Sequence, residues 1–351
     1  MKTYINEMKK CIKLAKLAQG HTSPNPMVGC IILNKSGKII ATGIHNKYGE
    51  FHAERNALNK LEDATDCTLV VNLEPCVHQG KTPPCTDIII EKGIKRVVYG
   101  MKDPNPLVSG KGLEKLKEAG IEVIGPVLKK ECEVLNEVFI KNQTQNKTFV
   151  AIKTATTIDG KIATHNGDSK WITSSKARNE VKYIRRRQDA ILTSAKTIIA
   201  DNPTMEFKKK VVLDRELKTD FENAEIYKQG EIYVFYNSEQ NSKILNQVQN
   251  DRILFIPTPT KNKKLNIEFV LDKLFELGIM SVLVEAGGEI NASFLPYTDK
   301  IYQFIAPKLL ADNSGKSCFD GSKVNKIADC TQFKIENYAL YPPDILITYS
   351  R

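Results

Sequence analysis

The sequence predicts an α/β protein built from two domains. Apolar runs typical of strands alternate along the chain with segments of helical periodicity, an order that favours sheets covered by helices. At 351 residues the chain is longer than one hydrophobic core usually supports. A polar run at residues 141–147 reads as a linker, and the pattern restarts at Phe149. We therefore expect one domain over residues 1–145 and a second over residues 146–351.

The first half begins with a helix at residues 4–19, where the apolar residues recur at helical spacing until Gly20. A strand at 28–33 and a returning strand at 39–44 flank a polar turn, which indicates a hairpin. The later elements expected in this half are helices at 52–61, 84–92, 112–119 and 129–142 and strands at 68–73, 97–99 and 121–124.

The second half repeats the alternation and predicts another sheet. Its expected strands lie at 149–153, 190–193, 211–213, 232–235, 253–256, 281–285, 300–306 and 345–349. Its expected helices lie at 175–187, 266–277 and 289–295.

A metal site is indicated by His52-Ala53-Glu54, Glu74-Pro75-Cys76 and a third segment that ends at Cys85. One imidazole and two thiolates suit Zn²⁺, and three protein ligands leave a fourth position open for water. Glu54 lies two residues after His52, where it can carry protons without binding the metal. This is the arrangement of zinc deaminases, although their cysteines are usually separated by two residues and here the insert is longer.

Two other interpretations of these residues are possible. One is a closed structural site, with Cys67, His78 or His45 as fourth ligand. Such a site has no use for a carboxylate beside its ligands. Alternatively His52 packs in a core, which fits poorly with two cysteines that each follow a proline. The pattern favours a catalytic zinc site.

Bulk composition narrows the class of protein. A hydrophobic content of 41% and a charged content of 26% are ordinary for a globular chain. The formal charge of +10 suits nucleic acid, but it suits a phosphorylated small substrate or cofactor equally well. No apolar run approaches the ~20 residues of a membrane span, and the N-terminus lacks a signal peptide's apolar core. Eight cysteines without an export signal favour the reducing cytoplasm.

The motifs together resemble one enzyme family. The first half carries them at residues 25–29, 52–54, 73–76, 80–85 and 103–106, and the second half at 153–160, 171–174, 200–203, 284–288 and 305–310. In this order they resemble the bifunctional riboflavin-biosynthesis deaminase/reductase over nearly the whole chain. The long insert between the two cysteines is the most specific part of the resemblance.

The resemblance implies a cytidine-deaminase-like three-layer sandwich followed by a dihydrofolate-reductase-like domain. It implies zinc-dependent hydrolytic deamination of 2,5-diamino-6-(5-phosphoribosylamino)pyrimidin-4-one, then NADPH-dependent reduction of the ribosyl to a ribityl side chain. The implied cofactors are one Zn²⁺ per chain and NADPH. The expected partner is the phosphorylated pyrimidine, with no nucleic acid and no membrane, and the expected assembly is a homo-oligomer through the reductase domain.

The resemblance also assigns residues to the deaminase site. His52, Cys76 and Cys85 bind the metal, Glu54 is catalytic, and substrate binding falls to Asn25 and Glu74. His45, His78 and Lys81 are expected to line the same pocket. For Glu74 the plain alternative is a strand-end residue without a role.

The reductase assignments follow the second set of motifs. Expected cofactor-binding residues are Ala155, Trp171, Thr197, Asp201, Gly287, Gly288, Glu289, Ile290, Asn291, Ala292 and Ser293. Expected substrate-binding residues are Ser169, Arg185, Met205, Lys208 and Glu285. A glycine pair at a helix N-terminus lets backbone amides approach a phosphate closely. The plain alternatives are an ordinary strand-to-helix turn for the glycines, core packing for Trp171 and a surface helix for Arg185.

Some positions depart from the family pattern, namely Thr157, Met205, Lys208, Arg215 and Lys300. Lys208 matters most, because lysine offers a point charge where arginine offers a planar fork to a phosphate. Two rival functions remain at this point. One is a deaminase of tRNA or free cytidine, and the other is a zinc-stabilised regulatory module whose reductase half has lost its activity.

Overall fold

The computed structural model describes residues 3–80, 82–106, 108–239, 250–321 and 324–351. The chain divides into two compact units, Met1–Asn146 and Lys147–Arg351. Each unit has a sheet and a hydrophobic core of its own. None of the helices in the described ranges has the length and apolar character that a membrane span requires.

The first unit contains a mixed sheet of five strands in the order β2-β1-β3-β4-β5. Strand β1 runs antiparallel to both of its neighbours, whereas β3, β4 and β5 are parallel. Their bounds are β1 (Gly29–Leu33), β2 (Ile39–Ile44), β3 (Thr68–Leu73), β4 (Arg96–Met101) and β5 (Glu122–Ile124).

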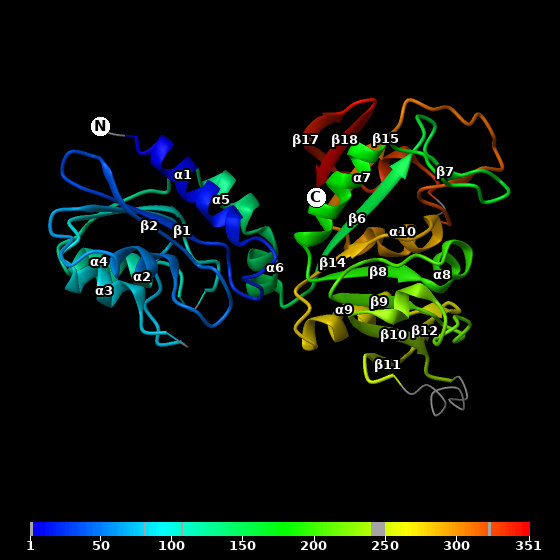
Figure 1. The fold of residues 1–351 in the computed structure, drawn as a ribbon, viewed down its shortest axis with the longest axis horizontal. Helices are drawn as coiled ribbons and strands as arrows, with labels where there is room; N and C mark the ends of the chain where they lie inside the picture. The colour runs from blue at the N-terminus through cyan, green and yellow to red at the C-terminus, as the bar shows by residue number, and fades with distance from the viewer. Residues whose placement is uncertain (1–2, 81, 107, 240–249, 322–323) are drawn as a thin grey trace. The chain divides into compact units, whose positions relative to one another are not determined.

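Helices cover both faces of this sheet and make three layers (Figure 1). One face carries α1 (Ile5–Ala15) and α5 (Lys129–Leu135), and the other carries α2 (Ala53–Leu58), α3 (Cys85–Glu91) and α4 (Lys111–Glu118). A further helix, α6 (Glu137–Gln145), ends the unit. Met8, Ile31 and Val70 are fully buried in the core between these layers.

Two glycines allow helices to lie unusually close to the segments that carry the predicted metal ligands. A Cβ atom at Gly43 on β2 would lie 1.9 Å from the Ala53 carbonyl oxygen at the start of α2. A Cβ atom at Gly112 on α4 would lie 2.1 Å from the Pro75 carbonyl oxygen. Any side chain at either position would push these segments apart.

The second unit contains a sheet of nine strands in the order β11-β10-β9-β8-β14-β6-β15-β18-β17. The strands from β11 to β15 are parallel, and β18 runs antiparallel to both β15 and β17. Their bounds are β6 (Phe149–Thr156), β8 (Ala190–Ser194), β9 (Lys209–Leu213), β10 (Glu231–Asn237), β11 (Ile253–Thr258), β14 (Ser281–Val284), β15 (Lys300–Ile305), β17 (Lys334–Tyr341) and β18 (Asp344–Ser350).

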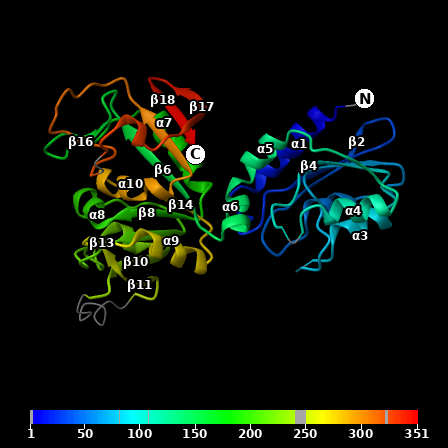
Figure 2. The same ribbon diagram turned by 180° about the vertical axis from the view of Figure 1, so that it is seen from behind.

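Alternate side chains of these strands enter two cores. Figure 2 shows α8, α9 and α10 beside the strands of this sheet. One core includes residues of α9 (Ile267–Glu276) and α10 (Gly288–Phe294), and the other includes α8 (Ala195–Asp201) and the segment 217–227. Helix α7 (Ser175–Arg186) precedes β8. Two small ladders pair β7 (Lys161–Ala163) with β16 (Lys316–Ser317) and β12 (Thr260–Lys261) with β13 (Lys264–Leu265).

The expected alternation of strands and helices is confirmed, and the strands at 39–44 and 68–73 have the predicted bounds. The single helix expected at 129–142 is wrong, because the chain breaks at Asn136 into α5 and α6. The linker expected at 141–147 is wrong as far as Gln145, since α6 extends to that residue. Helix α8, strand β17 and the two small ladders were not predicted.

Candidate active sites

His52, Cys76 and Cys85 form a compact cluster of potential metal ligands in the first unit. The Nδ1 atom of His52 lies 3.5 Å from the Cys76 Sγ atom and 3.4 Å from the Cys85 Sγ atom. Tetrahedral zinc with ordinary Zn–N and Zn–S bonds separates such atoms by about 3.6 Å. The distances therefore fit a zinc ion held by one nitrogen and two sulfur atoms.

The ligands come from three element ends. His52 is the extended residue immediately before α2, Cys76 follows β3 in a loop, and Cys85 opens α3. The backbone N–H of Cys85 donates to the Cys76 sulfur at 3.3 Å. A helix N-terminus stabilises nearby thiolates, because its free N–H groups carry partial positive charge.

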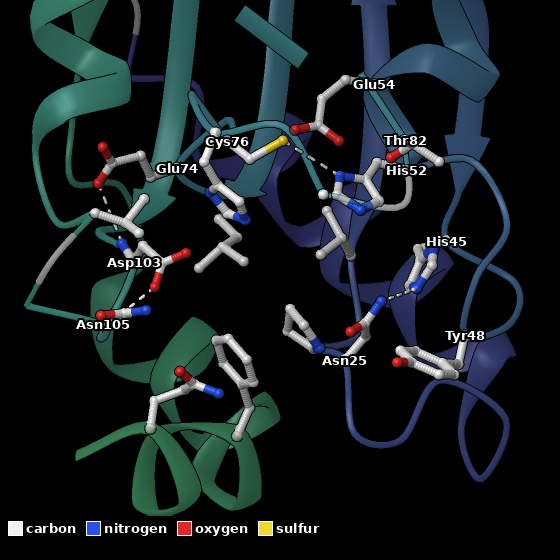
Figure 3. A pocket seen from close by; sticks show the side chains of 18 of the residues that line it. Asn25, His45, Tyr48, His52, Glu54, Glu74, Cys76, Thr82, Asp103 and Asn105 are labelled. Atoms are coloured by element: carbon white, nitrogen blue, oxygen red, sulfur yellow. Dashed lines mark hydrogen bonds between the residues drawn. The ribbon is translucent and has the colours of Figure 1, made fainter. Parts of the chain in front are cut away.

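Glu54 lies beside this cluster in the first turn of α2 and is only 3% exposed. Burial raises the pKa of its carboxyl to about 7, although the charge of His52 opposes the shift. Figure 3 shows the carboxylate next to Cys76 and His52. A carboxyl group in this environment is suited to accept and return a proton near neutral pH.

The closed structural site has no fourth ligand in the described part of the chain, where the cluster comprises His52, Cys76 and Cys85. Cys67 belongs to the hydrophobic core at the edge of β3. His45 is engaged elsewhere, by Asn25 and by the Phe51 carbonyl. The cluster instead opens into a pocket.

This pocket has a volume of about 290 Å³. Its lining residues include His52, Glu54, Asn25 and Glu74 of the predicted set, together with His45 and His78. The prediction for Lys81 concerns a residue outside the described ranges. Lining residues to which no role was assigned from the sequence include Tyr48, Asp103, Asn105, Phe139 and Gln143.

The hydrogen bonds of His45 fix the orientation of the Asn25 amide. His45 Nδ1 lies 3.1 Å from the Phe51 carbonyl oxygen, which can only accept, so Nδ1 carries the proton. Burial lowers the pKa of His45, so the ring is neutral and its Nε2 atom accepts from Asn25 Nδ2 at 3.1 Å. The Asn25 side-chain oxygen remains as an acceptor for a ligand in the pocket (Figure 3).

Glu74 is 3% exposed and serves as an anchor for a loop. Its carboxylate accepts from the backbone N–H groups of Asp103, Gly110 and Gly112 at 3.1, 3.0 and 3.0 Å. The loop that it holds brings Asp103 and Asn105 to the side of the pocket opposite His45 and Tyr48 (Figure 3). Glu74 thus organises part of the pocket wall, and its role in substrate binding stays a prediction.

In the second unit a buried ion cluster joins Arg185 and Glu285 of the predicted set. Arg185 donates to Glu285 through Nε at 2.7 Å and through a terminal nitrogen at 3.1 Å. Lys153, which sequence reasoning missed, lies 2.9 Å from the same carboxylate. Burial alone would raise the pKa of Glu285, but Lys153 and Arg185 hold it at about 2. Arg185 is thus not a residue of a surface helix face.

Several residues predicted to bind the cofactor lie at or just after the carboxyl ends of parallel strands. Ala155 is near the end of β6, Thr197 follows β8 in α8, and Gly287 follows β14 at the start of α10. Lys196 pairs with Glu289 at 2.8 Å, which links α8 to α10. Ligands of open α/β sheets bind at such strand ends.

The two glycines before α10 have different surroundings. A Cβ atom at Gly288 would lie 2.3 Å from the Ser317 carbonyl oxygen, whereas nothing lies within 4 Å of one at Gly287. Gly288 is therefore required by packing inside the unit. Gly287 alone is open to a ligand on its Cβ side.

Trp171 and Ser169 line a second pocket, of about 500 Å³, together with Lys161 and Lys308. Trp171 is 62% exposed, and the Arg178 guanidinium lies over its ring at 4.3 Å. The core-packing alternative for Trp171 is therefore wrong. Arg185, Glu285 and the glycine turn are not among the residues that line this pocket.

Three further residues predicted for the reductase site do not line either of these pockets. Met205 is buried in the core that includes α8, and Lys208 is an exposed residue just before β9. The charge of Glu206 nevertheless raises the pKa of Arg185, so the segment at residues 205–208 lies near the ion cluster. Asp201 is the last residue of α8 and is exposed.

Three departures from the family pattern have local partners within the second unit. Thr157 donates to Asp159 at 2.6 Å through a hydroxyl that serine would also supply. Lys300 is buried and pairs with Glu336 at 3.0 Å. Arg215 follows β9 and donates to Glu216 and to the Lys263 carbonyl.

Comparison with known proteins assigns both halves of the chain to one family. Residues 1–101 match the cytidine and deoxycytidylate deaminase zinc-binding region, and residues 148–347 match the RibD C-terminal domain. The riboflavin biosynthesis protein RibD of Actinobacillus pleuropneumoniae is 38% identical, over 99% of this chain and 95% of its own length. The chain belongs to the RibD family. RibD of Escherichia coli is 34% identical, over 97% of each chain.

Solved structures agree over both units. A Thermotoga maritima diaminohydroxyphosphoribosylaminopyrimidine deaminase/5-amino-6-(5-phosphoribosylamino)uracil reductase has a TM-score of 0.88 and 38% identity, covering 99% of this chain and 98% of its own. Acinetobacter baumannii RibD has a TM-score of 0.84 and 31% identity, covering 99% and 98%. The chain is a bifunctional enzyme of riboflavin biosynthesis, with a cytidine-deaminase-like domain and a RibD reductase domain. This excludes both rival functions.

Proposed function

We propose that the chain deaminates 2,5-diamino-6-(5-phosphoribosylamino)pyrimidin-4-one in its first unit. We further propose that it reduces the ribosyl group of the product to ribityl with NADPH in its second unit. The observation that carries the first assignment is the cluster of His52, Cys76 and Cys85 with Glu54 in one pocket. Residues 1–145 then form the deaminase domain and residues 146–351 the reductase domain.

The donor set supports one zinc ion per chain, held by His52, Cys76 and Cys85. When bound, zinc lowers the pKa of water and supplies a nucleophile at neutral pH. Glu54 accepts one proton of the attacking water and passes it to a ring nitrogen. It then takes the remaining proton of the added hydroxyl and gives it to the departing amine. The bond from the ring carbon to the amino group breaks, a carbonyl forms there, and ammonia leaves.

The pyrimidine is oriented by polar groups around the pocket. The Asn25 side-chain oxygen accepts from the ring, since its nitrogen is committed to His45. Asp103 and Asn105 contact the opposite edge, in a position that Glu74 fixes through the loop backbone. Glu74 therefore contributes to substrate binding mainly by holding this loop.

The carboxyl ends of β6, β8 and β14 would hold NADPH, with Gly287 and the following residues of α10 for its phosphates. When bound, NADPH would supply the hydride for the C1′ carbon of the opened ribosyl group. Lys153 delivers the accompanying proton to the nitrogen bonded to that carbon, and Glu285 holds the Lys153 ammonium in place at 2.9 Å. Arg185, Lys208, Ser169 and Met205 shape the site around the phosphoribosyl group.

A homo-oligomer through the reductase domain is supported by β17. This strand pairs with β18 alone in the nine-stranded sheet, so its outer edge offers unpaired backbone groups. Ile335, Tyr338 and Leu340 on it are 65%, 69% and 72% exposed. A second copy of the chain is the occupant that we propose. The eight free cysteines, two of them metal ligands, support a reducing compartment, the cytoplasm.

Metal analysis of single-cysteine variants tests the zinc assignment. Cys85→Ser is expected to lose zinc and ammonia release together, because the thiolate is a ligand. Cys67→Ser is the matched control, a buried cysteine outside the cluster, and it is expected to retain one zinc per chain. Full zinc occupancy in Cys85→Ser would remove this residue from the site.

A further inference from the structure

Helix α6 contributes to the deaminase pocket, although its sequence resembles a polar linker. Phe139 and Gln143 both line the pocket that contains His52 and Glu54. They are four residues apart, so they lie on the same face of the helix. Phe139 is partly buried, and Gln143 is exposed.

The start of α6 is fixed to the pocket wall by Asn136. This residue is 3% exposed and precedes the first residue of the helix. The backbone N–H of Met27 donates to Asn136 Oδ1 at 2.8 Å, and Asn136 Nδ2 donates to the Met27 carbonyl at 3.1 Å. Met27 lies between Pro26 and Val28, which both line the pocket. These two hydrogen bonds fix the start of α6 relative to the pocket-lining segment at residues 26–28.

The size of the substrate directs part of it toward α6. The pocket volume of about 290 Å³ is at the lower end of the range of small-molecule sites, roughly 300–1,000 Å³. The amino-bearing ring must lie near His52 and Glu54 to react. The phosphoribosyl group attached to the ring therefore extends toward the exposed part of the lining, which includes Tyr48, His78 and Gln143.

We propose that Phe139 and Gln143 are specificity-determining residues of the deaminase step and that Asn136 is their positioning residue. Phe139 offers an apolar face to the ring or ribose, and the uncharged Gln143 amide donates to the phosphoribosyl group. Glu50 and Asp103 also line the pocket, so an amide is a more suitable neighbour for a phosphate than a further carboxylate. This inference rests on the deaminase function proposed above.

Steady-state ammonia release by the full-length zinc-loaded chain tests the proposal. Gln143→Glu keeps the side-chain shape but places a negative charge near the phosphate, so the KM for the phosphorylated substrate is expected to rise about tenfold. Gln145→Glu is the matched control, with the same change on the same helix but outside the pocket lining. It is expected to leave KM within about twofold, a difference small against the tenfold step.

Phe139→Ala and Phe139→Leu extend the test to the apolar contact. Both are expected to raise KM, the alanine variant more, while zinc content stays at one per chain. If wild type releases no ammonia, the deaminase function itself fails. If wild type is active and Gln143→Glu has the same KM as Gln145→Glu, the proposal is overturned, whatever happens to the folding of the Phe139 variants.

Discussion

Three buried glutamates keep their carboxyl groups inside the molecule by different means. Glu54 lies in a pocket wall, where burial raises its pKa to about 7. Glu74 receives three backbone N–H groups. Glu285 is paired with Lys153 and Arg185, whose charges outweigh its burial and hold its pKa at about 2. The first is suited to proton transfer, the second to fixing a loop, and the third to holding cations in place.

Replacing Glu54 by glutamine is expected to abolish proton transfer without loss of the metal. Zinc content should stay at one per chain, while kcat for ammonia release falls on the order of 10²–10⁴-fold. NADPH oxidation with the deaminated intermediate serves as an internal control, because that reaction belongs to the other unit. Normal deamination by this variant would show that another group carries the proton.

Glu285 gives an acid-dependent contribution to stability. Its folded pKa, about 2, lies below the ordinary value of 4.5, so the contribution is complete above pH 4.5 and disappears as the pH falls toward 2. Glu285→Gln leaves the partly buried cations of Lys153 and Arg185 without their carboxylate and is expected to cost about 3 kcal/mol at pH 7. Urea unfolding at pH 7 and pH 3 should show this difference shrinking in acid, and a constant difference would contradict the ion cluster.

At the scale of the elements, glycines decide how closely helices approach the sites. Gly43 and Gly112 allow α2 and α4 to lie against the sheet and the Pro75 segment, so the predicted metal ligands converge. Gly288 plays a similar part in the second unit, where its neighbours are Ser317 and Asp320. The sequence shows glycine at these positions, but only the packing shows what it is required for.

A matched pair of alanine variants separates packing from cofactor binding at α10. Gly288→Ala brings a Cβ atom to 2.3 Å from the Ser317 carbonyl oxygen, which costs about 1–3 kcal/mol if the segment at 317–320 moves. The melting temperature of a unit of this size then falls by about 2–4 °C per kcal/mol, measured without NADPH. Gly287→Ala should leave it unchanged, since its Cβ side is open. Equal melting temperatures for the two variants would contradict this assignment.

Local pattern was sufficient for most elements of the fold. Apolar runs located β2 and β3, and motif spacing located His52, Glu54, Cys76 and Cys85 in one cluster. Local sequence pattern was insufficient where contacts between distant segments determine whether a helix forms or which charges pair. The polar residues of α6 form a helix because Asn136 fixes its start against Met27, 109 residues away in sequence. Lys153 was missed because its partner Glu285 lies on a distant strand end.

At the scale of the whole molecule, two units with separate cores each carry one candidate site. The cluster of His52, Cys76 and Cys85 and its pocket use residues of the first unit alone. The ion cluster around Glu285 uses residues of the second alone. Full-length similarity to RibD proteins joins the two activities in one pathway. We propose that one substrate passes through both reactions in a fixed order, deamination first and reduction second.

Ammonia release and NADPH oxidation, measured on one preparation supplied with the diaminopyrimidine substrate, test this claim most directly. We expect one ammonia and one NADPH per substrate, with NADPH oxidation lagging behind ammonia. Removing zinc with a chelator should stop both reactions from this substrate, yet leave NADPH oxidation intact when the deaminated intermediate is supplied. NADPH oxidation from the diaminopyrimidine without any ammonia release would contradict the account.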